Sequence, residues 1–210
     1  MKKLLFVLYT FITLSSFSQA TFSDSITSNG RKLIQILDSS HVEELWLKGY
    51  RVDWETGQPL AVSKNPKSTH CSAFAASIAK KMGIYLLRPP EHKSTLLANA
   101  QYDWIQTSSA EKEGWTKVND GLTAQNEANK GNLVVTIFKN PDETRPGHIS
   151  IIRPAVKSIK LITKEGPQTT QAGGTNAFSI PLKHGFGNHP GAWPDGVIFY
   201  EHTIDWNSVR

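Results

Sequence analysis

The sequence predicts a single α+β domain in which helices come first along the chain and strands follow. In the first half of the mature chain, apolar residues recur at the spacing of helices. In the second half, short runs rich in Val, Ile, Phe and Thr are bounded by Gly, Pro or Asn, as strands are. Helices followed by strands are typical of helices that pack against an antiparallel sheet.

The first twenty residues have the pattern of a signal peptide. Lys2 and Lys3 form a short basic start, an apolar run covers residues 4–14, and "SSFSQA" places small side chains before a cleavage site after Ala20. A membrane span needs about 20 apolar residues, and this run is eleven residues long, including Thr10 and Thr13. We therefore expect a signal peptide over residues 1–20, no stable membrane anchor, and a periplasmic or secreted protein of residues 21–210.

The mature chain is long enough for one domain with a buried core. The net charge of the full chain is +5, and removal of Lys2 and Lys3 with the signal peptide leaves a net side-chain charge of +3. The sequence contains no block of five or more like charges. A nucleic-acid partner is therefore not expected.

Three helical segments are expected in the first half. The first covers residues 28–49, with Ser28 or Asn29 as its N-cap and Gly49 as its end. Turn residues throughout 49–69 indicate a loop. A second helix is expected over 71–82, ending at a glycine, and a third over 93–106, after the break at "RPPEH".

The second half is expected to supply the sheet. Five runs have the composition of strands: "NLVVTIFKN" (132–140), "HISIIRP" (148–154), "SIKLITKEG" (158–166), "QTTQAGG" (168–174) and "GVIFYEH" (196–202). In this two-layer arrangement the helix over 71–82 lies in one layer, and side chains on the strands face it from the other.

Cys71 is the only cysteine, so no intramolecular disulfide can form. In an oxidising compartment a lone thiol is kept either because it is buried and inert or because its chemistry is used. The position at a helix start favours chemistry, because free N–H groups and the helix dipole there stabilise a thiolate. On this interpretation the pKa of the thiol should lie below its ordinary value.

A nucleophilic cysteine needs a base, which is usually histidine. Among seven histidines, His148 is distinctive because "RPGHISIIRP" places it at the first position of an apolar strand, after a glycine that lets another segment come close. His70 adjoins Cys71 in sequence, but neighbours on a helix do not face each other. His184 and His189 lie in the glycine-rich stretch "KHGFGNHPGAW", which is typical of a loop.

Two blocks, "HCSAFAASIAKKMG" (70–83) and "KGNLVVTIFKNPDETRPGHISIIRP" (130–154), resemble the motifs of the NlpC-type cell-wall cysteine peptidases, and the CHAP-type amidases share both. In that family Asp-Cys-Ser-Gly-Phe/Leu opens the central helix of a papain-like domain, and Gly-His-Val/Ile begins a strand. The resemblance implies a papain-like fold that hydrolyses peptide or amide bonds in peptidoglycan. It implies Cys71 as the nucleophile and His148 as the general base.

The sequence departs from the family pattern at several positions. His70 stands where the family has aspartate, Ala73 where it has glycine, and Asn132 where a strand usually begins with aspartate. The family's tyrosine, about ten residues before the cysteine, has no counterpart, so the resemblance identifies no oxyanion donor.

The family takes a third catalytic member from the strand after the histidine strand, and the resemblance offers two candidates. Asn176 follows the glycines of "QTTQAGGTNAF" and is preferred because it is similar to the papain-like asparagine. Gln171 precedes those glycines and is the alternative. Both residue types are also common where a strand ends in a turn.

Three other functions compete with this interpretation. A zinc site would need paired Cys-x-x-Cys or His-x-x-x-His spacing, which is missing, so no metal is expected. No cofactor is expected either, since no phosphate-binding glycine loop follows an expected strand. A non-catalytic papain-like module could bind glycans or cell wall through loop tryptophans such as Trp54, Trp115 and Trp193. A Cys–His acyltransferase, or a toxin-like amidase acting on a protein, would use the same residues.

Overall fold

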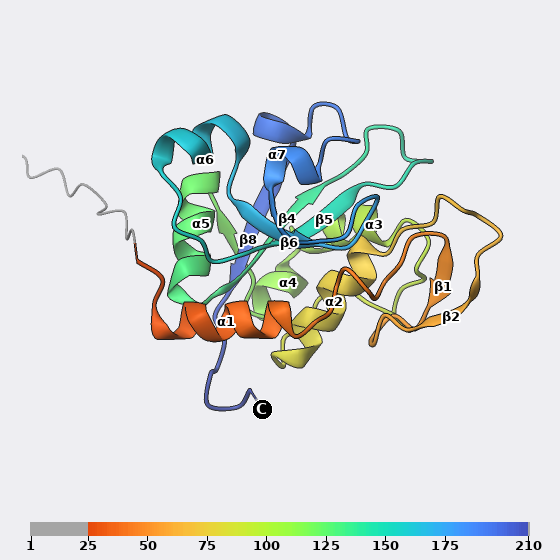
Figure 1. Ribbon diagram of the computed structural model, residues 1–210, viewed down its shortest axis with the longest axis horizontal. Coiled ribbons are helices and arrows are strands. Elements are labelled where there is room, and N and C mark those ends of the chain that lie inside the picture. Colours follow the sequence, from red (N-terminus) through yellow and green to blue (C-terminus); the bar gives the residue numbers. More distant parts are fainter. Residues whose placement is uncertain (1–24, 210) are drawn as a thin grey trace, which may run out of the picture.

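The computed structural model describes residues 25–209, so the expected signal peptide over residues 1–20 lies outside the described part. The chain forms a six-stranded antiparallel sheet and a separate two-stranded hairpin, with helices packed around the sheet (Figure 1). The α+β class is therefore confirmed. Among the described residues, no helix is long and apolar enough to cross a membrane.

Seven α-helices and eight strands make up the part of the chain that the structure describes. The helices are α1 (Ser28–Asp38), α2 (Cys71–Lys81), α3 (Leu97–Trp104), α4 (Ser108–Lys112), α5 (Gly121–Lys130), α6 (Ile159–Glu165) and α7 (Leu182–Gly185), and an irregular helical turn, η1, covers Ala192–Gly196. The strands are β1 (Tyr50–Val52), β2 (Pro59–Val62), β3 (Thr116–Val118), β4 (Leu133–Phe138), β5 (His148–Ile152), β6 (Gln168–Gln171), β7 (Ala177–Pro181) and β8 (Ile198–His202).

The order of strands in the large sheet places the ends of β5 and β6 together. The order is β3-β8-β4-β5-β6-β7, and every neighbouring pair is antiparallel. Phe138 of β4 lies opposite His148, and Ile151 of β5 lies opposite Thr170 of β6. Because β5 and β6 run in opposite directions, the first residue of β5 and the last residue of β6 lie at the same end of the sheet.

Apolar side chains fill both faces of the sheet, as the alternation along β4 shows. Leu133, Val135 and Ile137 belong to the cluster that contains α2, whereas Val134 belongs to a second cluster with residues of α5 and α7. Helices therefore cover both faces, and the expected arrangement of one helical layer on one sheet is wrong in this respect. A strand buried on both faces has apolar residues at every position, as "LVVTIF" nearly does.

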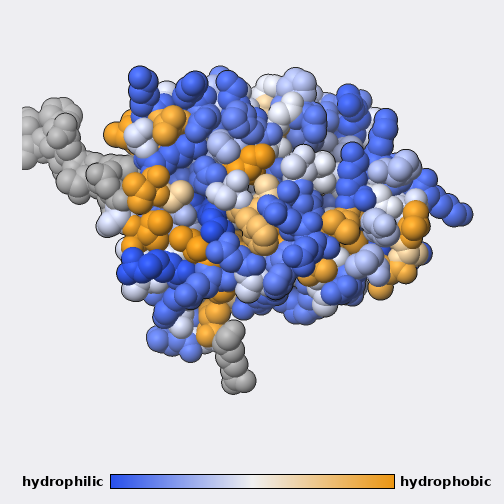
Figure 2. Space-filling model, in the orientation of Figure 1, coloured by the Kyte–Doolittle hydropathy of each residue, from blue (hydrophilic) through white to orange (hydrophobic). Residues whose placement is uncertain are grey.

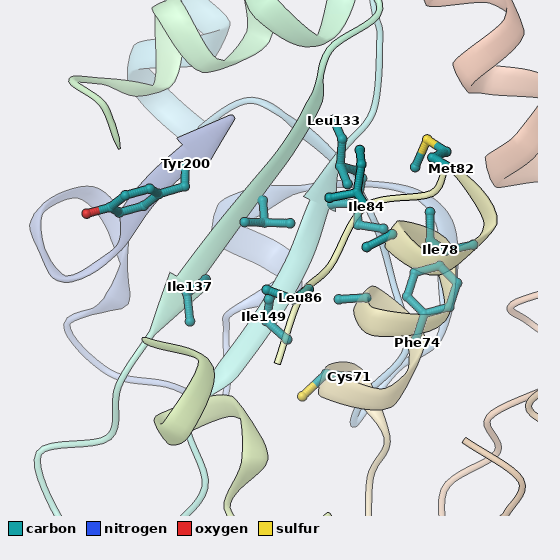
Figure 3. Packing of buried hydrophobic residues seen from close by; sticks show 14 of the residues in the cluster. Cys71, Phe74, Ile78, Met82, Ile84, Leu86, Leu133, Ile137, Ile149 and Tyr200 are labelled. Carbon is teal, nitrogen blue, oxygen red and sulfur yellow. The ribbon is translucent and has the colours of Figure 1, made fainter. Parts of the chain in front are cut away.

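Helix α2 packs closely on the sheet because its residues are small. Phe74 and Ile78 are fully buried in the same apolar cluster as the strand residues Leu133 and Ile149, and Figure 3 shows these side chains around α2. Burying each such side chain contributes roughly 1.5–3 kcal/mol to stability. The helix ends before Gly83, whose φ of +72° is readily adopted by glycine. The predicted start of this helix and its glycine stop are therefore confirmed, and its last helical residue is Lys81 instead of Met82.

Several segments differ from the sequence-based expectations. Residues 41–48 form turns instead of helix, and His41 and Trp46 have positive φ angles. The loop over 49–69 contains the β1–β2 hairpin, whose Leu60 and Val62 are exposed. In Figure 2 the surface is mainly hydrophilic, with apolar patches that include one toward the side where this hairpin lies.

The segment 158–166 is helix α6 instead of the expected strand, and α5 was not expected at all. Both helices begin with a side-chain cap: Ser158 accepts a hydrogen bond from the N–H of Leu161, and Asp120 accepts one from the N–H of Thr123. A cap of this kind stabilises a helix by about 1 kcal/mol. In α6 the cap outweighs the strand propensity of its isoleucines.

Candidate functional site

Cys71 is the first residue of α2, and its side chain is only 5% exposed. The helix packs on β5, and the backbone N–H of Ile149 lies close enough to the sulfur to favour its charged form. In Figure 3 the sulfur points away from the helix toward the side where the strands lie. His70, at the N-cap position, makes no side-chain cap bond, so no side chain competes for the N–H groups at the helix start.

Burial raises the pKa of the Cys71 thiol above its ordinary value, which corrects the expectation of a low pKa. Removing the sulfur from water disfavours the charged thiolate, and this is the largest effect. The backbone N–H groups of Ile149, Ser72 and Cys71 itself act in the opposite direction but are smaller effects. The resting group is therefore a protonated thiol near neutral pH.

His148 is paired with Gln171 at the shared end of β5 and β6. The distance between His148 Nε2 and Gln171 Oε1 is 3.0 Å, and both side chains are buried. The carboxamide NH₂ of Gln171 donates to the carbonyl oxygens of Thr175 and Gly185, at 3.0 and 3.4 Å. These two bonds orient Gln171 so that Oε1, an acceptor, faces the imidazole.

This orientation assigns the tautomer of His148. Because Gln171 Oε1 can only accept, His148 Nε2 must carry the proton and donate it. In the neutral imidazole Nδ1 then holds the lone pair and can act as a base. Burial lowers the pKa of His148 to about 4, while the bond to Gln171 acts weakly in the opposite direction. The ring is therefore neutral near pH 7, which is the state that a general base requires.

Asn176, the preferred third member, forms its hydrogen bonds with backbone groups and not with His148. Its NH₂ group donates to the backbone oxygens of Val42 and Leu45, at 2.7 and 2.8 Å, and its Oδ1 accepts from the N–H of Gly173 at 2.9 Å. With these partners Asn176 ties the turn after β6 to the segment after α1. Of the two candidates, Gln171 and not Asn176 is the partner of the imidazole.

The thiol and the imidazole lie near the same strand start but are not bonded to each other. Among the described residues, no hydrogen bond joins Cys71 to His148. The His148 ring instead packs against Phe186 and stacks on His189, with ring centroids 4.5 and 5.3 Å apart. Cys71 and Ile149 belong to the cluster around α2, whereas Phe186 belongs to the second cluster.

Asn99 of α3 fixes the segment that leads into β5, a role that no sequence motif indicated. Its Oδ1 accepts from the N–H of Gly147 at 2.8 Å, and its NH₂ donates to the Arg145 carbonyl at 3.0 Å. A Cβ at Gly147 would collide with Asn99 Oδ1 and the Phe138 carbonyl. The Pro-Gly pair before His148 indicated that another segment approaches the backbone closely at this point. The sequence did not indicate that Asn99 is the residue that approaches it.

Two neighbouring hollows open at the site. One of about 400 Å³ is lined by Cys71, and one of about 560 Å³ is lined by His148. Lys67, Thr69 and Pro146 line both, so the two hollows adjoin. A larger hollow of about 670 Å³ lies elsewhere, between β3, α5 and η1. No cysteine or histidine lines that third hollow, so it offers no comparable nucleophile and base.

The remaining sequence candidates have structural contacts. His70 Nε2 lies 2.8 Å from the Tyr50 carbonyl, and Asn132 donates to the carboxylates of Glu127 and Glu201, at the end of β4 away from His148. Trp115 is buried with its Nε1 bonded to a carbonyl. Within residues 25–209, no group of three or more His, Cys, Asp and Glu side chains is arranged to hold a metal ion.

Comparison with known proteins adds no assignment. No protein-family model matches the chain, and no curated protein sequence matches it.

Proposed function

We propose that the protein is an exported papain-like cysteine hydrolase that cleaves peptide or amide bonds in peptidoglycan. The observation that carries the proposal is the His148–Gln171 pair, because it leaves Nδ1 of a neutral imidazole as the base. Cys71 opens α2 beside the strand that His148 begins. A helix that starts with cysteine and packs on an antiparallel sheet is also the arrangement that the papain-like resemblance implies.

The proposed reaction uses this chain's residues in a fixed order. His148 Nδ1 takes the proton of the Cys71 thiol as the sulfur attacks the carbonyl carbon of the scissile amide. The N–H groups at the start of α2 stabilise the negative oxygen of the tetrahedral intermediate. The C–N bond then breaks, the amine leaves with the proton from His148, and a thioester remains on Cys71. Water, deprotonated by the same imidazole, hydrolyses the thioester and restores the thiol.

The separation of thiol and imidazole defines what substrate binding must do. Catalytic hydrogen bonds are often long or poorly aligned before substrate binds and tighten in the complex. A raised thiol pKa and a lowered imidazole pKa both favour the neutral pair in the resting protein. We therefore expect the proton to move from Cys71 to His148 as the sulfur attacks the substrate. A thiolate–imidazolium pair is not expected to form before the substrate binds.

A second candidate function is a non-catalytic cell-wall binding module on the same frame. It is favoured by the buried, protonated thiol and by the lack of a thiol–imidazole bond among the described residues. On this alternative Cys71 is a core residue of α2, and the hollows bind wall peptides without cutting them.

Incubation with purified peptidoglycan separates the two candidates. Wild-type protein, Cys71→Ala and His148→Ala should be compared, with soluble fragments identified by mass spectrometry. His92→Ala is a matched control, because His92 is half-buried on a loop, and the one hydrogen bond of its ring to residues 25–209 is with the neighbouring Lys93 carbonyl. The enzyme proposal expects fragments from wild type and His92→Ala only. Binding of sacculi by all four proteins, without release of fragments, would support the binding module.

A further inference from the structure

The hollow beside His148 is lined by positive charge. Its rim carries Lys48, Lys67 and Arg145, all exposed, and the rings of His184 and His189 also line it. No aspartate or glutamate is among the residues that line it. A concave surface with cations and without carboxylates concentrates field lines and attracts anions.

The cations of this rim are not neutralised by ion pairs. None of the salt bridges among residues 25–209 includes Lys48, Lys67 or Arg145. The carboxylate of Asp142 interacts with the charge of Arg145 without forming an ion pair, and it accepts hydrogen bonds from the side chain and N–H of Thr144. The three rim cations are therefore free to meet a ligand's charge.

The floor of the hollow holds a buried polar group of the proposed reaction. His148 is 4% exposed and lines the hollow, and among the described residues its Nδ1 makes no hydrogen bond. Lys67, Thr69 and Pro146 connect this hollow to the one that Cys71 lines. A ligand that spans both hollows can place an amide near Cys71 and a second group in the basic hollow.

We infer that the basic hollow binds a carboxylate of an acidic peptide, so that the substrate of this site carries negative charge beside the bond that is cut. The inference rests on the proposed function, since it names the substrate class of the same site. A bound carboxylate would also offset the positive potential that Arg145 contributes around His189. It would also raise the pKa of the nearby His148 imidazole, so that the neutral ring becomes a stronger base toward the thiol proton.

The test measures binding separately from cleavage. Full-length Cys71→Ala protein is titrated by calorimetry with four peptides of one sequence, which differ in glutamate or glutamine at one position and in a free or amidated C-terminus. The peptide with both carboxylates should bind about tenfold or more tightly than the neutral one, which corresponds to about 1.4 kcal/mol. The two singly charged peptides identify which carboxylate is used. The gain in affinity should shrink at high salt.

Charge reversal locates the site. Lys67→Glu and Arg145→Glu should each remove most of the gain, whereas Lys160→Glu, an exposed control on α6 outside the hollow, should keep it. Equal binding of charged and neutral peptides, no binding of any peptide, or equal losses in Lys160→Glu would overturn the inference. Cleavage of neutral peptides as fast as acidic ones would contradict the inferred carboxylate binding but would support the proposed hydrolase function. Tight binding of acidic peptides that the wild-type protein never cuts would support the inferred carboxylate binding but would contradict the proposed hydrolase function.

Discussion

His148 Nε2 donates a hydrogen bond to Gln171 Oε1 across 3.0 Å, and the two residues occupy the first position of β5 and the last position of β6. The antiparallel pairing of these strands brings the two positions to the same end of the sheet. Because the NH₂ group of Gln171 is bonded to two carbonyl groups, the pair can form with only one imidazole tautomer. This geometry makes Gln171 a positioning residue in the proposed enzyme.

Replacement of Gln171 should therefore change the pH profile of hydrolysis as well as the rate. We expect Gln171→Ala to lower kcat/KM by part of the roughly 10²–10⁴-fold that general acid–base catalysis supplies. Gln171→Glu should move the acidic limb of the profile to higher pH, because a carboxylate beside the ring favours imidazolium and raises the pKa of His148. The measurement is kcat/KM on a peptide substrate between pH 4 and 9.

Asn176→Ala is the matched control for this prediction. Its amide bonds Gly173 and the segment after α1, so its loss should lower the free energy of unfolding by about 1–3 kcal/mol. The pH profile of the surviving activity should stay unchanged. A shifted profile in Asn176→Ala, with an unshifted one in Gln171→Glu, would instead make Asn176 the functional partner.

The Gly173–Gly174 pair offers a second comparison. A Cβ at Gly173 would lie 2.9 Å from Cε1 of the buried His148 ring, whereas a Cβ at Gly174 would meet only the flexible end of Asn188 at 3.2 Å. Gly173→Ala should displace the imidazole and reduce kcat strongly, and Gly174→Ala should retain near-wild-type kcat. Both variants should be checked for folding by circular dichroism. Equal activity of the two would show that the ring position in the structure does not govern turnover.

The cysteine helix, the histidine strand and their contact with each other were predictable from the sequence because they depend on local pattern. Small residues after Cys71 and alternating apolar residues after His148 define elements that must be buried together. The choice between Gln171 and Asn176 was not predictable, since it depends on which amide the fold directs at the ring. Helix α6 was missed because the Ser158 cap outweighs the strand propensity of its isoleucines.

The rate at which Cys71 is alkylated should increase as the pH rises above neutral. Burial raises the pKa of Cys71, so the thiol is protonated near neutral pH, and iodoacetamide should modify it more slowly than an unperturbed thiol there. The alkylation rate should increase with a midpoint above that of free cysteine, which is about 8.5. Mass spectrometry of the quenched protein at each pH provides the rates. Fast modification at pH 6, with a midpoint below that of free cysteine, would show that the helix start and His148 dominate over burial.

Acid should destabilise the fold through His148. The pKa of His148 is lowered from 6.5 to about 4 in the folded protein, so the unfolded chain binds more protons between these values. Stability is therefore fully present above about pH 6.5 and falls as the pH approaches 4, by up to roughly 3 kcal/mol from this group. Urea unfolding at several pH values measures the loss. His148→Gln should flatten this dependence, and the part that remains should be due to His189, whose pKa burial also lowers to about 4.

The central claim is that the sulfur of Cys71 attacks the substrate, and the most direct test is the intact mass of the protein during turnover. Mature protein is mixed with purified peptidoglycan peptides, quenched in acid after milliseconds to seconds, and weighed by mass spectrometry. The account predicts a transient adduct with the mass of an acyl fragment, located on Cys71 by digestion and absent from Cys71→Ala. Release of the same fragments by Cys71→Ala, at the wild-type rate, would contradict it.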